Sequence, residues 1–418
     1  MSNLQNILYL KDFFGHSNPA ELITKFGSPL YVYNEEIMRQ RCREMKHLVD
    51  YEHFTANYSI KANTNLSLLR IAKDEGFYAD AMSPGELNAL EKAGFSPEQI
   101  FFVPNNVGDD ELLYAQSRNI CTSLDSLDQL ERFGRLAAGS KAAIRINPGL
   151  GTGHHEKVIT AGKMTKFGIS ANQIKEAQSI ASRYQIKLIG LNQHIGSLFM
   201  EPGVYLEAAR QLFDLAMTFP DLEFIDLGGG FGIPYHKLSG ESRLDLNALG
   251  QGLLNLIHDF IAQYGRPVKI KIEPGRYIVA ECGILLGTVY AKKVNNGVLY
   301  AGTDIGFNVL ARPMLYDAWH DIVVYRDGQL LLCDQTEPVT VVGNICESGD
   351  IIAKERPLPA LRQNDILAVL DAGAYGYAMS SNYNSRLRPA EVLIRKNQEA
   401  VLIRRRETFE DLTRTCFE

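Results

Sequence analysis

One lysine of the chain lies where covalent chemistry could take place. Lys61 belongs to the stretch Asn57-Tyr-Ser-Ile-Lys-Ala-Asn63, at the end of an apolar strand and directly before a helix. A free lysine has a pKa of about 10.4, so as a nucleophile or Schiff-base former it needs a shielded site that holds it neutral or bonded to a carbonyl. The alternative is a lysine that extends its amine into water from a loop.

Other chemically unusual residues also follow strand candidates. They are Asp80 after the second strand, His194 and Ser197 after the sixth, Gly228, Gly229, Gly230 and Gly232 after the seventh, and Glu273, Gly275 and Arg276 after the eighth. In barrel enzymes the chemistry sits at the carboxyl ends of the strands. A single pocket could therefore gather Lys61 and all of these residues.

The glycine cluster after the seventh strand candidate indicates a phosphate site. Glycines let backbone N–H groups approach a phosphate closely, and barrel phosphate sites commonly use the loops after strands seven and eight. Ser197 could add a hydroxyl and Arg276 a cation. The alternative is a tight turn, because glycine also solves simple steric problems. A Schiff-base lysine beside a phosphate cradle favours a phosphorylated aldehyde, and pyridoxal 5'-phosphate is the natural candidate.

Two further residues suit a pyridoxal ring. The ring nitrogen must stay protonated for the ring to accept electrons, and Glu273 is placed to stabilise that proton. His194 could stack on the face of the ring. The alternatives are a surface glutamate that caps the next segment and a core histidine with satisfied hydrogen bonds.

The elements that must position these residues alternate between short apolar runs and longer amphipathic stretches. Eight strands are predicted at about 55–61, 78–82, 100–104, 119–124, 142–147, 187–194, 223–228 and 268–273. Helix-like segments such as 84–95, 171–184 and 203–218 lie between them. Strands that alternate with helices imply parallel pairing, and eight such units within about 250 residues favour a (β/α)8 barrel over an open sheet.

A second pattern begins near Gly283, where long strands follow one another without helices and Asn-Gly or Asp-Gly pairs mark hairpins. The fold class is therefore α/β, a TIM-like barrel followed by a β-rich domain. We expect three parts: an N-terminal segment 1–30 that joins the β domain through a strand around Ile7–Leu10, a barrel at 31–282, and the β domain at 283–418.

Composition narrows the class of protein. The 418 residues carry a formal charge of −6, so we expect no nucleic-acid partner. The first residues do not read as a signal peptide, and no apolar stretch reaches membrane length, so we expect no membrane association and a cytoplasmic protein. The six cysteines lack metal-binding spacing, which predicts neither a disulfide framework nor a metal site.

Many ordered motifs carry a resemblance to a known family. They are Tyr58-Ser-Ile-Lys-Ala-Asn63, Asp80-Ala-Met-Ser-Pro-Gly-Glu-Leu87, the segment 153–169, His194-Ile-Gly-Ser197, Leu227-Gly-Gly-Gly-Phe-Gly232, Glu273-Pro-Gly-Arg276, Arg312-Pro-Met-Leu-Tyr316, Cys346-Glu-Ser-Gly-Asp350, Ala372-Gly-Ala-Tyr-Gly376 and Arg388-Pro-Ala-Glu-Val-Leu393. The chain resembles the pyridoxal-phosphate decarboxylases of alanine-racemase fold (fold type III, which includes ornithine decarboxylase), and within them the diaminopimelate decarboxylases.

The resemblance implies a role for each matched position. Lys61 would bond the cofactor, and Cys346 would act as the general acid that returns a proton after carbon dioxide leaves. The implied cofactor contacts are Lys61, Asp80, His194, Ser197, Gly228, Gly229, Gly230, Glu273, Gly275, Arg276 and Tyr375, and the implied substrate contacts are Arg276, Arg312, Tyr316, Glu347 and Tyr375. The implied reaction converts meso-2,6-diaminopimelate to L-lysine and carbon dioxide, the last step of lysine biosynthesis.

The family also implies a homodimer in which Cys346 and Glu347 reach the neighbouring subunit's site. Four positions depart from the family pattern: Asn192, Leu198, Asn344 and Leu387. These departures leave room for a sibling decarboxylase that acts on a carboxylated polyamine precursor or another D-configured basic amino acid. A racemase of the same fold would need a catalytic tyrosine opposite the lysine, and a non-catalytic relative would have lost the lysine or the acid.

Overall fold

The computed structural model describes residues 10–149, 152–153, 166–332 and 335–417. They form two compact units. A barrel unit contains residues 40–233 and 243–278, and a β unit contains residues 1–39, 234–242 and 279–418. Most of the expected 153–169 motif lies outside the described residues, as do residues 7–9 of the expected N-terminal strand.

The barrel unit is built on parallel strands that match the predicted ones in number and order. They are β2 (Phe54–Ser59), β3 (Tyr78–Ala81), β4 (Ile100–Phe102), β5 (Cys121–Leu124), β6 (Lys141–Asn147), β9 (Lys187–Asn192), β11 (Phe224–Asp226) and β12 (Lys269–Ile272). Each strand pairs in parallel with its neighbours, and the pairings of β12 with β2 and of β5 with β6 close the ring. The predicted barrel is therefore confirmed.

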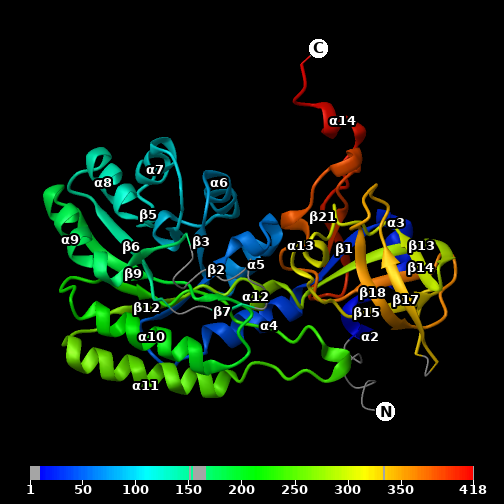
Figure 1. The fold of residues 1–418 in the computed structure, drawn as a ribbon, viewed down its shortest axis with the longest axis horizontal. Helices are drawn as coiled ribbons and strands as arrows, with labels where there is room; N and C mark the ends of the chain where they lie inside the picture. Colours follow the sequence, from blue (N-terminus) through cyan, green and yellow to red (C-terminus); the bar gives the residue numbers. More distant parts are fainter. Residues whose placement is uncertain (1–9, 150–151, 154–165, 333–334, 418) are drawn as a thin grey trace. The chain divides into compact units, whose positions relative to one another are not determined.

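Helices run along the outside of the barrel strands (Figure 1). They are α5 (Leu66–Asp74), α6 (Pro84–Ala93), α7 (Asp109–Gln116), α8 (Leu127–Leu136), α9 (Ile174–Arg183), α10 (Pro202–Ala216) and α11 (Leu246–Tyr264). Several start at a polar side chain that accepts a first-turn N–H, as Ser83 does before α6 and Asp245 before α11. The expected helix 84–95 ends at residue 93, because Gly94 takes the left-handed conformation that terminates helices.

The β unit contains one large mixed sheet. Its strands are β1 (Leu30–Asn34), β13 (Gly283–Asn295), β14 (Val298–Thr303), β15 (Ile322–Arg326), β16 (Gln329–Leu330), β17 (Glu337–Val342), β18 (Ile351–Leu358), β19 (Ile366–Val369), β20 (Ala390–Ile394) and β21 (Ala400–Arg404). The predicted hairpin at Asn296-Gly297 joins β13 to β14, and both residues have positive φ angles as a two-residue hairpin requires.

The N-terminal part of the chain differs from the expectation. The predicted barrel boundary at residue 31 falls inside β1, which pairs antiparallel with β13 and parallel with β20 in the β unit. Residues 31–39 therefore belong to the β unit, and so does the segment 234–242. The apolar run at Leu30–Tyr33 is buried on both sides by sheet neighbours, which a boundary drawn from helix–strand alternation does not reveal. Leu10, expected in a strand, begins the helix α2 (Leu10–Phe13).

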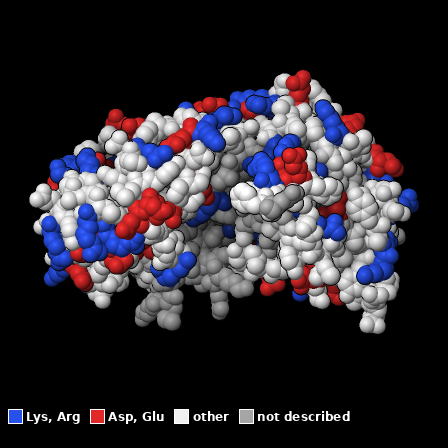
Figure 2. All heavy atoms as spheres, turned by 90° about the horizontal axis from the view of Figure 1, so that it is seen from above, with Lys and Arg blue, Asp and Glu red and all other residues white. Residues whose placement is uncertain are grey.

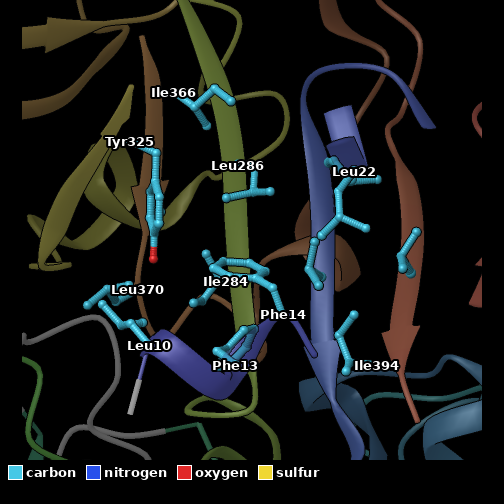
Figure 3. Packing of buried hydrophobic residues seen from close by; sticks show 14 of the residues in the cluster. Leu10, Phe13, Phe14, Leu22, Ile284, Leu286, Tyr325, Ile366, Leu370 and Ile394 are labelled. Atoms are coloured by element: carbon cyan, nitrogen blue, oxygen red, sulfur yellow. The ribbon is translucent and has the colours of Figure 1, made fainter. Parts of the chain in front are cut away.

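A hydrophobic core holds the N-terminal helices against the sheet of the β unit (Figure 3). Phe13 and Phe14 of the N-terminal segment pack with side chains of β13 such as Ile284 and Leu286, and the ring of Phe14 meets that of Tyr325 edge-on at 5.8 Å between centroids. Burying apolar side chains of this size contributes about 1.5–3 kcal/mol each. The N-terminal segment is thus part of the core of the β unit.

Charged side chains of both signs lie interspersed over the face drawn in Figure 2. Exposed charges of this kind contribute little to stability, so the charges of chemical interest are those that are buried. Among the residues that the structure describes, no helix combines the length and apolar character needed to cross a bilayer.

Candidate active site

Lys61 lies where the strand β2 gives way to a short 3-10 turn, Ile60–Ala62. Its two neighbours are fully buried, whereas Lys61 itself is half-buried. The turn is closed by the hydroxyl of Tyr58, which donates to the carbonyl oxygen of Asn63 at 3.0 Å. Lys61 is thus held at the carboxyl end of the strand, as predicted.

Asp80 lies beside this turn on the neighbouring strand β3, where it pairs with Ser59. The hydroxyl of Ser59 donates to Asp80 Oδ2 at 3.0 Å. Burial raises the pKa of Asp80 to about 8, the charge of Asp226 adds to the rise, and the charge of Lys61 opposes it. Near neutral pH the Asp80 carboxyl therefore holds its proton in part.

Glu273 follows β12 and is buried, with 6% of its surface exposed. Burial raises its pKa well above the ordinary value; the carboxyls of Asp226 and Asp80 add to the rise, and the charges of Lys61 and Arg145 lower it. Its Oε1 has no hydrogen-bond partner among the described residues. A buried carboxyl of this kind can accept a hydrogen bond from a cationic group, which would restore its charge.

His194 accepts a hydrogen bond at Nδ1 from the backbone N–H of Gly229, at 3.2 Å. Burial lowers the pKa of His194 well below its usual value, and the charges of Lys61 and Arg145 lower it further. The imidazole is therefore neutral and carries its proton on Nε2. Because the charge of Lys61 acts on Asp80, Glu273 and His194, these four residues share one site.

The glycine loop is folded so closely onto its neighbours that side chains do not fit. A Cβ on Gly228 would lie 2.1 Å from the carbonyl oxygen of Gln193, and one on Gly229 would lie 2.1 Å from that of Glu273. Gly228 and Gly230 also have φ angles of +76° and +104°. The tight-turn explanation of these glycines therefore holds. The same close packing places the loop directly against Glu273 and His194.

Arg276 lies beside Ser197, and its Nη2 donates to Ser197 Oγ at 2.8 Å. Arg276 is buried, and it follows Gly275, where a Cβ would come within 3.0 Å of Ser59. Ser197 belongs to the short strand β10 (Gly196–Ser197). A cation and a hydroxyl thus stand together next to the glycine loop, as a phosphate site would require.

Arg145 and Asp226 are two functional candidates that sequence reasoning missed. Arg145 is a buried cation in β6; it lies 3.7 Å from Asp125 and acts on both His194 and Glu273. Asp226 accepts the backbone N–H of Gly228 at 2.9 Å, and burial raises its pKa to about 6. The available signal was a charged residue inside an otherwise apolar strand.

Arg312 begins the short helix α13 (Arg312–Tyr316) of the β unit and is 2% exposed. Its Nη1 lies 2.7 Å from His320 Nε2, and its guanidinium carbon lies 4.7 Å from the centre of the Tyr235 ring. Tyr316, at the end of the same helix, is half-buried. Arg312 is thus a cation held inside the β unit.

Cys346 and Glu347 lie on an exposed loop of the β unit. The backbone N–H of Cys346 donates to Asn384 Oδ1 at 2.8 Å, and the hydroxyl of Tyr383 donates to Glu347 Oε1 at 2.6 Å. Asp350 fixes the base of the loop, because its carboxylate accepts the N–H of Ile345 at 2.8 Å. The Cys346 thiol and the Glu347 carboxylate are therefore accessible.

Tyr375 is half-buried and has a φ angle of +56°, a conformation rarely adopted by a bulky side chain. Nearby, a Cβ on Gly373 would lie 1.9 Å from the carbonyl oxygen of Val279, so the backbone of this loop is tightly packed. Tyr375, Arg312, Tyr316, Cys346 and Glu347 all belong to the β unit, and their meeting with the barrel residues stays a prediction.

Comparisons with known proteins agree with this geometry. Residues 35–280 match the family described as pyridoxal-dependent decarboxylase, pyridoxal binding domain. A diaminopimelate decarboxylase from Methanothermobacter thermautotrophicus is 40% identical over 410 residues, which cover 96% of this chain and 94% of the relative. The chain belongs to the diaminopimelate decarboxylase family. The diaminopimelate decarboxylase of Escherichia coli K12 is 34% identical and covers 94% of this chain, with 95% of its own length matched.

Solved structures of the diaminopimelate decarboxylase family extend the likeness to the fold. A diaminopimelate decarboxylase from Helicobacter pylori complexed with L-lysine superposes with a TM-score of 0.87 at 31% identity, covering 95% of this chain and 98% of that one. A lysine/ornithine decarboxylase from Vibrio vulnificus, at 21% identity and a TM-score of 0.77, shares the fold. The predicted pairing of a barrel with a β-rich domain is thus confirmed.

As a pyridoxal-dependent decarboxylase, the chain is a lyase whose cofactor is pyridoxal phosphate. Its barrel residues fit that cofactor: Glu273 has a buried oxygen without a partner among the described residues, His194 presents a neutral ring, and Arg276 with Ser197 stands beside the glycine loop. Asn192, a departure from the family pattern, is buried and accepts the hydroxyl of Ser123, so it serves the barrel interior.

Proposed function

We propose that the protein decarboxylates meso-2,6-diaminopimelate at its D-centre, releasing carbon dioxide and L-lysine as the last step of lysine biosynthesis, in the cytoplasm. The relatives named as diaminopimelate decarboxylases support the reaction. The observation that carries the choice of substrate is the buried Arg312, at a position where the family binds substrate. A fixed guanidinium complements the second carboxylate of diaminopimelate, which ornithine and lysine lack as substrates.

We assign the cofactor to residues of the barrel unit and, from the β unit, Tyr375. Lys61 would bond it, Glu273 would hold the proton on its ring nitrogen, and His194 would stack on its ring. The phosphate would lie against the Gly228–Gly230 loop, with Ser197, Gly275, Arg276 and Tyr375 around it and Asp80 beside Lys61. When bound, pyridoxal phosphate supplies a carbonyl that condenses with amines and a ring that accepts the electrons left when carbon dioxide departs.

The raised pKa of Glu273 is consistent with that role. An uncharged, buried carboxyl becomes charged when a cation reaches it, because the pair of charges offsets the cost of burial. The carboxyls of Asp226 and Asp80 raise the pKa of Glu273 further, and a cation bound beside these three carboxyls would favour their ionised forms. The barrel therefore strongly favours the protonated form of a nitrogen that lies beside Glu273.

Cys346 is proposed as the general acid of the reaction. Its thiol would give a proton to the α-carbon that has lost carbon dioxide, and the resulting thiolate would take a proton back from solvent. A thiol is a competent proton donor near neutral pH once it is positioned beside its acceptor and shielded from water. The adjacent Glu347 would hold the distal amine of the substrate, with Arg276 and Arg312 on the distal carboxylate and Tyr316 and Tyr375 beside it.

The exposed position of Cys346 supports a homodimer in which the loop completes the site of the neighbouring subunit. A general acid that works in a water-poor site must be shielded from solvent, but Cys346 and Glu347 are exposed on this loop. The family resemblance implies that a second copy of the chain shields them.

A substrate panel tests the proposed function. We expect kcat/KM for meso-diaminopimelate to exceed that for L-lysine, L-ornithine and a carboxylated polyamine precursor, with penalties that reach about 10⁴-fold, because a site built for a polar group rejects substrates that leave it unpaired. Arg312→Ala should reduce the ratio of kcat/KM for meso-diaminopimelate to kcat/KM for the other three compounds, mainly by slowing the diaminopimelate reaction. A wild-type preference for any of the other three compounds contradicts the substrate assignment.

A further inference from the structure

We propose that His320 is a positioning residue that fixes the guanidinium of Arg312 for the distal carboxylate of the substrate. The inference rests on the proposed function and adds a residue to it. His320 lies outside every motif that indicated the site, and it is buried, with 2% of its surface exposed. Its two ring nitrogens bridge Arg312 and the backbone of Leu370.

The chemistry of the partners decides the direction of both hydrogen bonds. A guanidinium has donors and no acceptor, so Arg312 Nη1 donates to His320 Nε2 at 2.7 Å. The ring proton is then on Nδ1, which donates to the carbonyl oxygen of Leu370, also at 2.7 Å. A neutral imidazole with one tautomer therefore connects the cation to a backbone carbonyl.

That carbonyl belongs to a rigid part of the sheet. Leu370 directly follows β19, which pairs antiparallel with β15 through Ile322 and Val369. The N–H of Leu370 donates to the carbonyl oxygen of Asp321 at 2.9 Å, so the backbones on both sides of His320 and Leu370 are joined. The position of the imidazole is thus set by the strand pairing.

A second contact restrains the same guanidinium from its face. Arg312 lies over the ring of Tyr235 at 4.7 Å, and that ring meets His320 edge-on, with 5.3 Å between ring centres. Tyr235 is buried as well. Together the two aromatic rings fix both the plane and the rotation of the guanidinium, which is what a two-bond grip on a carboxylate requires.

Removing this restraint should weaken binding of the carboxylate more than it slows the reaction. A guanidinium that must be ordered at each binding event loses part of its interaction energy to that ordering. The carboxyl that leaves as carbon dioxide is at the other end of the substrate. His320→Leu should therefore raise KM for meso-diaminopimelate about tenfold or more, the scale of a lost hydrogen bond to a charged group, and leave kcat within about twofold.

Two inhibitors separate the carboxylate from the rest of the ligand. L-lysine, the product, keeps the distal carboxylate, whereas 1,5-diaminopentane has the same chain and amines without it. In cofactor-loaded His320→Leu enzyme we expect the inhibition constant of L-lysine to rise about tenfold, like KM, and that of 1,5-diaminopentane to stay within about twofold. His320→Gln, whose side-chain oxygen can accept from Arg312, should recover most of the L-lysine affinity.

Trp319→Phe is the matched control for a structural effect. Trp319 Nε1 donates to Asp321 Oδ1 at 2.9 Å, so this variant disturbs the same strand end and leaves the bond to Arg312 intact. It should lower the melting temperature without changing the ratio of the two inhibition constants. Equal changes for both inhibitors in His320→Leu, or no recovery in His320→Gln, overturn the inference while the proposed function stands. A wild-type enzyme that prefers substrates without a distal carboxylate overturns both.

Discussion

The cofactor residues of the barrel and the Cys346 loop of the β unit are built in opposite ways. In the barrel, Glu273 and Asp80 are buried, and their raised pKa values come from that burial. In the loop, Cys346 and Glu347 are exposed and held by hydrogen bonds to Asn384 and Tyr383. The barrel residues are preorganised by the packing of their own unit, whereas the loop residues are only oriented by theirs.

This difference separates two tasks of the proposed enzyme. Electrostatic stabilisation of a cofactor works best in a dry, fixed environment that exists before the ligand arrives. A proton donor that must meet each new substrate can instead be supplied by a loop that a partner covers. We therefore expect substitutions in the barrel to affect cofactor binding, and substitutions in the loop to affect the reaction alone.

The largest effect is expected from removing the residue that bonds the cofactor. Lys61→Ala should abolish the visible absorbance of the purified protein and lower kcat by about 10⁴-fold or more, because nucleophile and positioning are lost together. Cys346→Ala should keep the absorbance and lower kcat by about 10²–10⁴-fold, the usual contribution of a general acid. Absorbance spectra and initial rates measure both, and loss of absorbance in Cys346→Ala would contradict the division of tasks.

The next effect tests whether the loop serves another subunit. Inactive Lys61→Ala and Cys346→Ala proteins, allowed to exchange subunits, should regain about a quarter of wild-type activity, because half of the dimers are mixed and each mixed dimer has one intact site. Activity is followed after mixing tagged proteins, with capture of both tags to demonstrate exchange. Mixed dimers without activity would refute the shared site.

A smaller effect concerns pH and the burial of Asp80. Its folded pKa of about 8 exceeds the ordinary 3.8, so between these values the folded protein holds a proton that the unfolded chain releases. The stabilising contribution is complete below pH 3.8 and is lost as pH rises through 8. From pH 5 to 8 the wild type should lose up to about 4 kcal/mol of unfolding free energy relative to Asp80→Asn.

Urea unfolding of the cofactor-loaded proteins at several pH values measures this difference. Asp411→Asn is the control: Asp411 is half-buried, and the hydrogen bond from Arg405 holds its pKa below the ordinary value, so it is ionised throughout that range. Asp411→Asn should therefore have the wild-type pH dependence. The same dependence in Asp80→Asn would show that the buried carboxyl is ionised in the folded protein.

The smallest expected effect is a change in KM, and it is tested on two hydrogen bonds of equal length. Tyr383 donates to Glu347 and Tyr184 donates to Glu131, both at 2.6 Å, the first in the loop and the second on the barrel surface. Tyr383→Phe should raise KM for meso-diaminopimelate by about two- to fivefold, the scale of one exposed hydrogen bond, and Tyr184→Phe should leave it unchanged. Steady-state kinetics measure both, and equal KM values would mean that Tyr383 does not orient Glu347.

The sequence predicted the barrel, which the structure confirms, because the barrel depends on local order; the cofactor residues stay a prediction. Lys61, His194 and Glu273 each follow an apolar run, and parallel strands bring their carboxyl ends to one rim. Arg145 and His320 were not predicted, because their importance comes from contacts made only in the folded chain: Arg145 acts on His194 and Glu273, and His320 bridges Arg312 and Leu370. Contacts of this kind leave no periodic trace in the sequence.

The errors in the domain boundaries have the same physical origin. The barrel boundary predicted at residue 31 places β1 in the barrel, but β1 pairs with β13 and β20. Strand pairing over long distances decides such cases, and propensity does not.

The position of β1 between β13 and β20 has a consequence for the order of folding during synthesis. The parallel partner of Leu30 is Ala390, about 360 residues later, so synthesis must continue for about 20–70 s before that pairing can form. All barrel strands, from β2 to β12, leave the ribosome earlier. The edge of the apolar strand β1 that pairs with β20 therefore keeps unpaired backbone N–H and C=O groups while the barrel assembles. In a chain that stops before residue 390 these groups stay unpaired, and the edge is prone to aggregation.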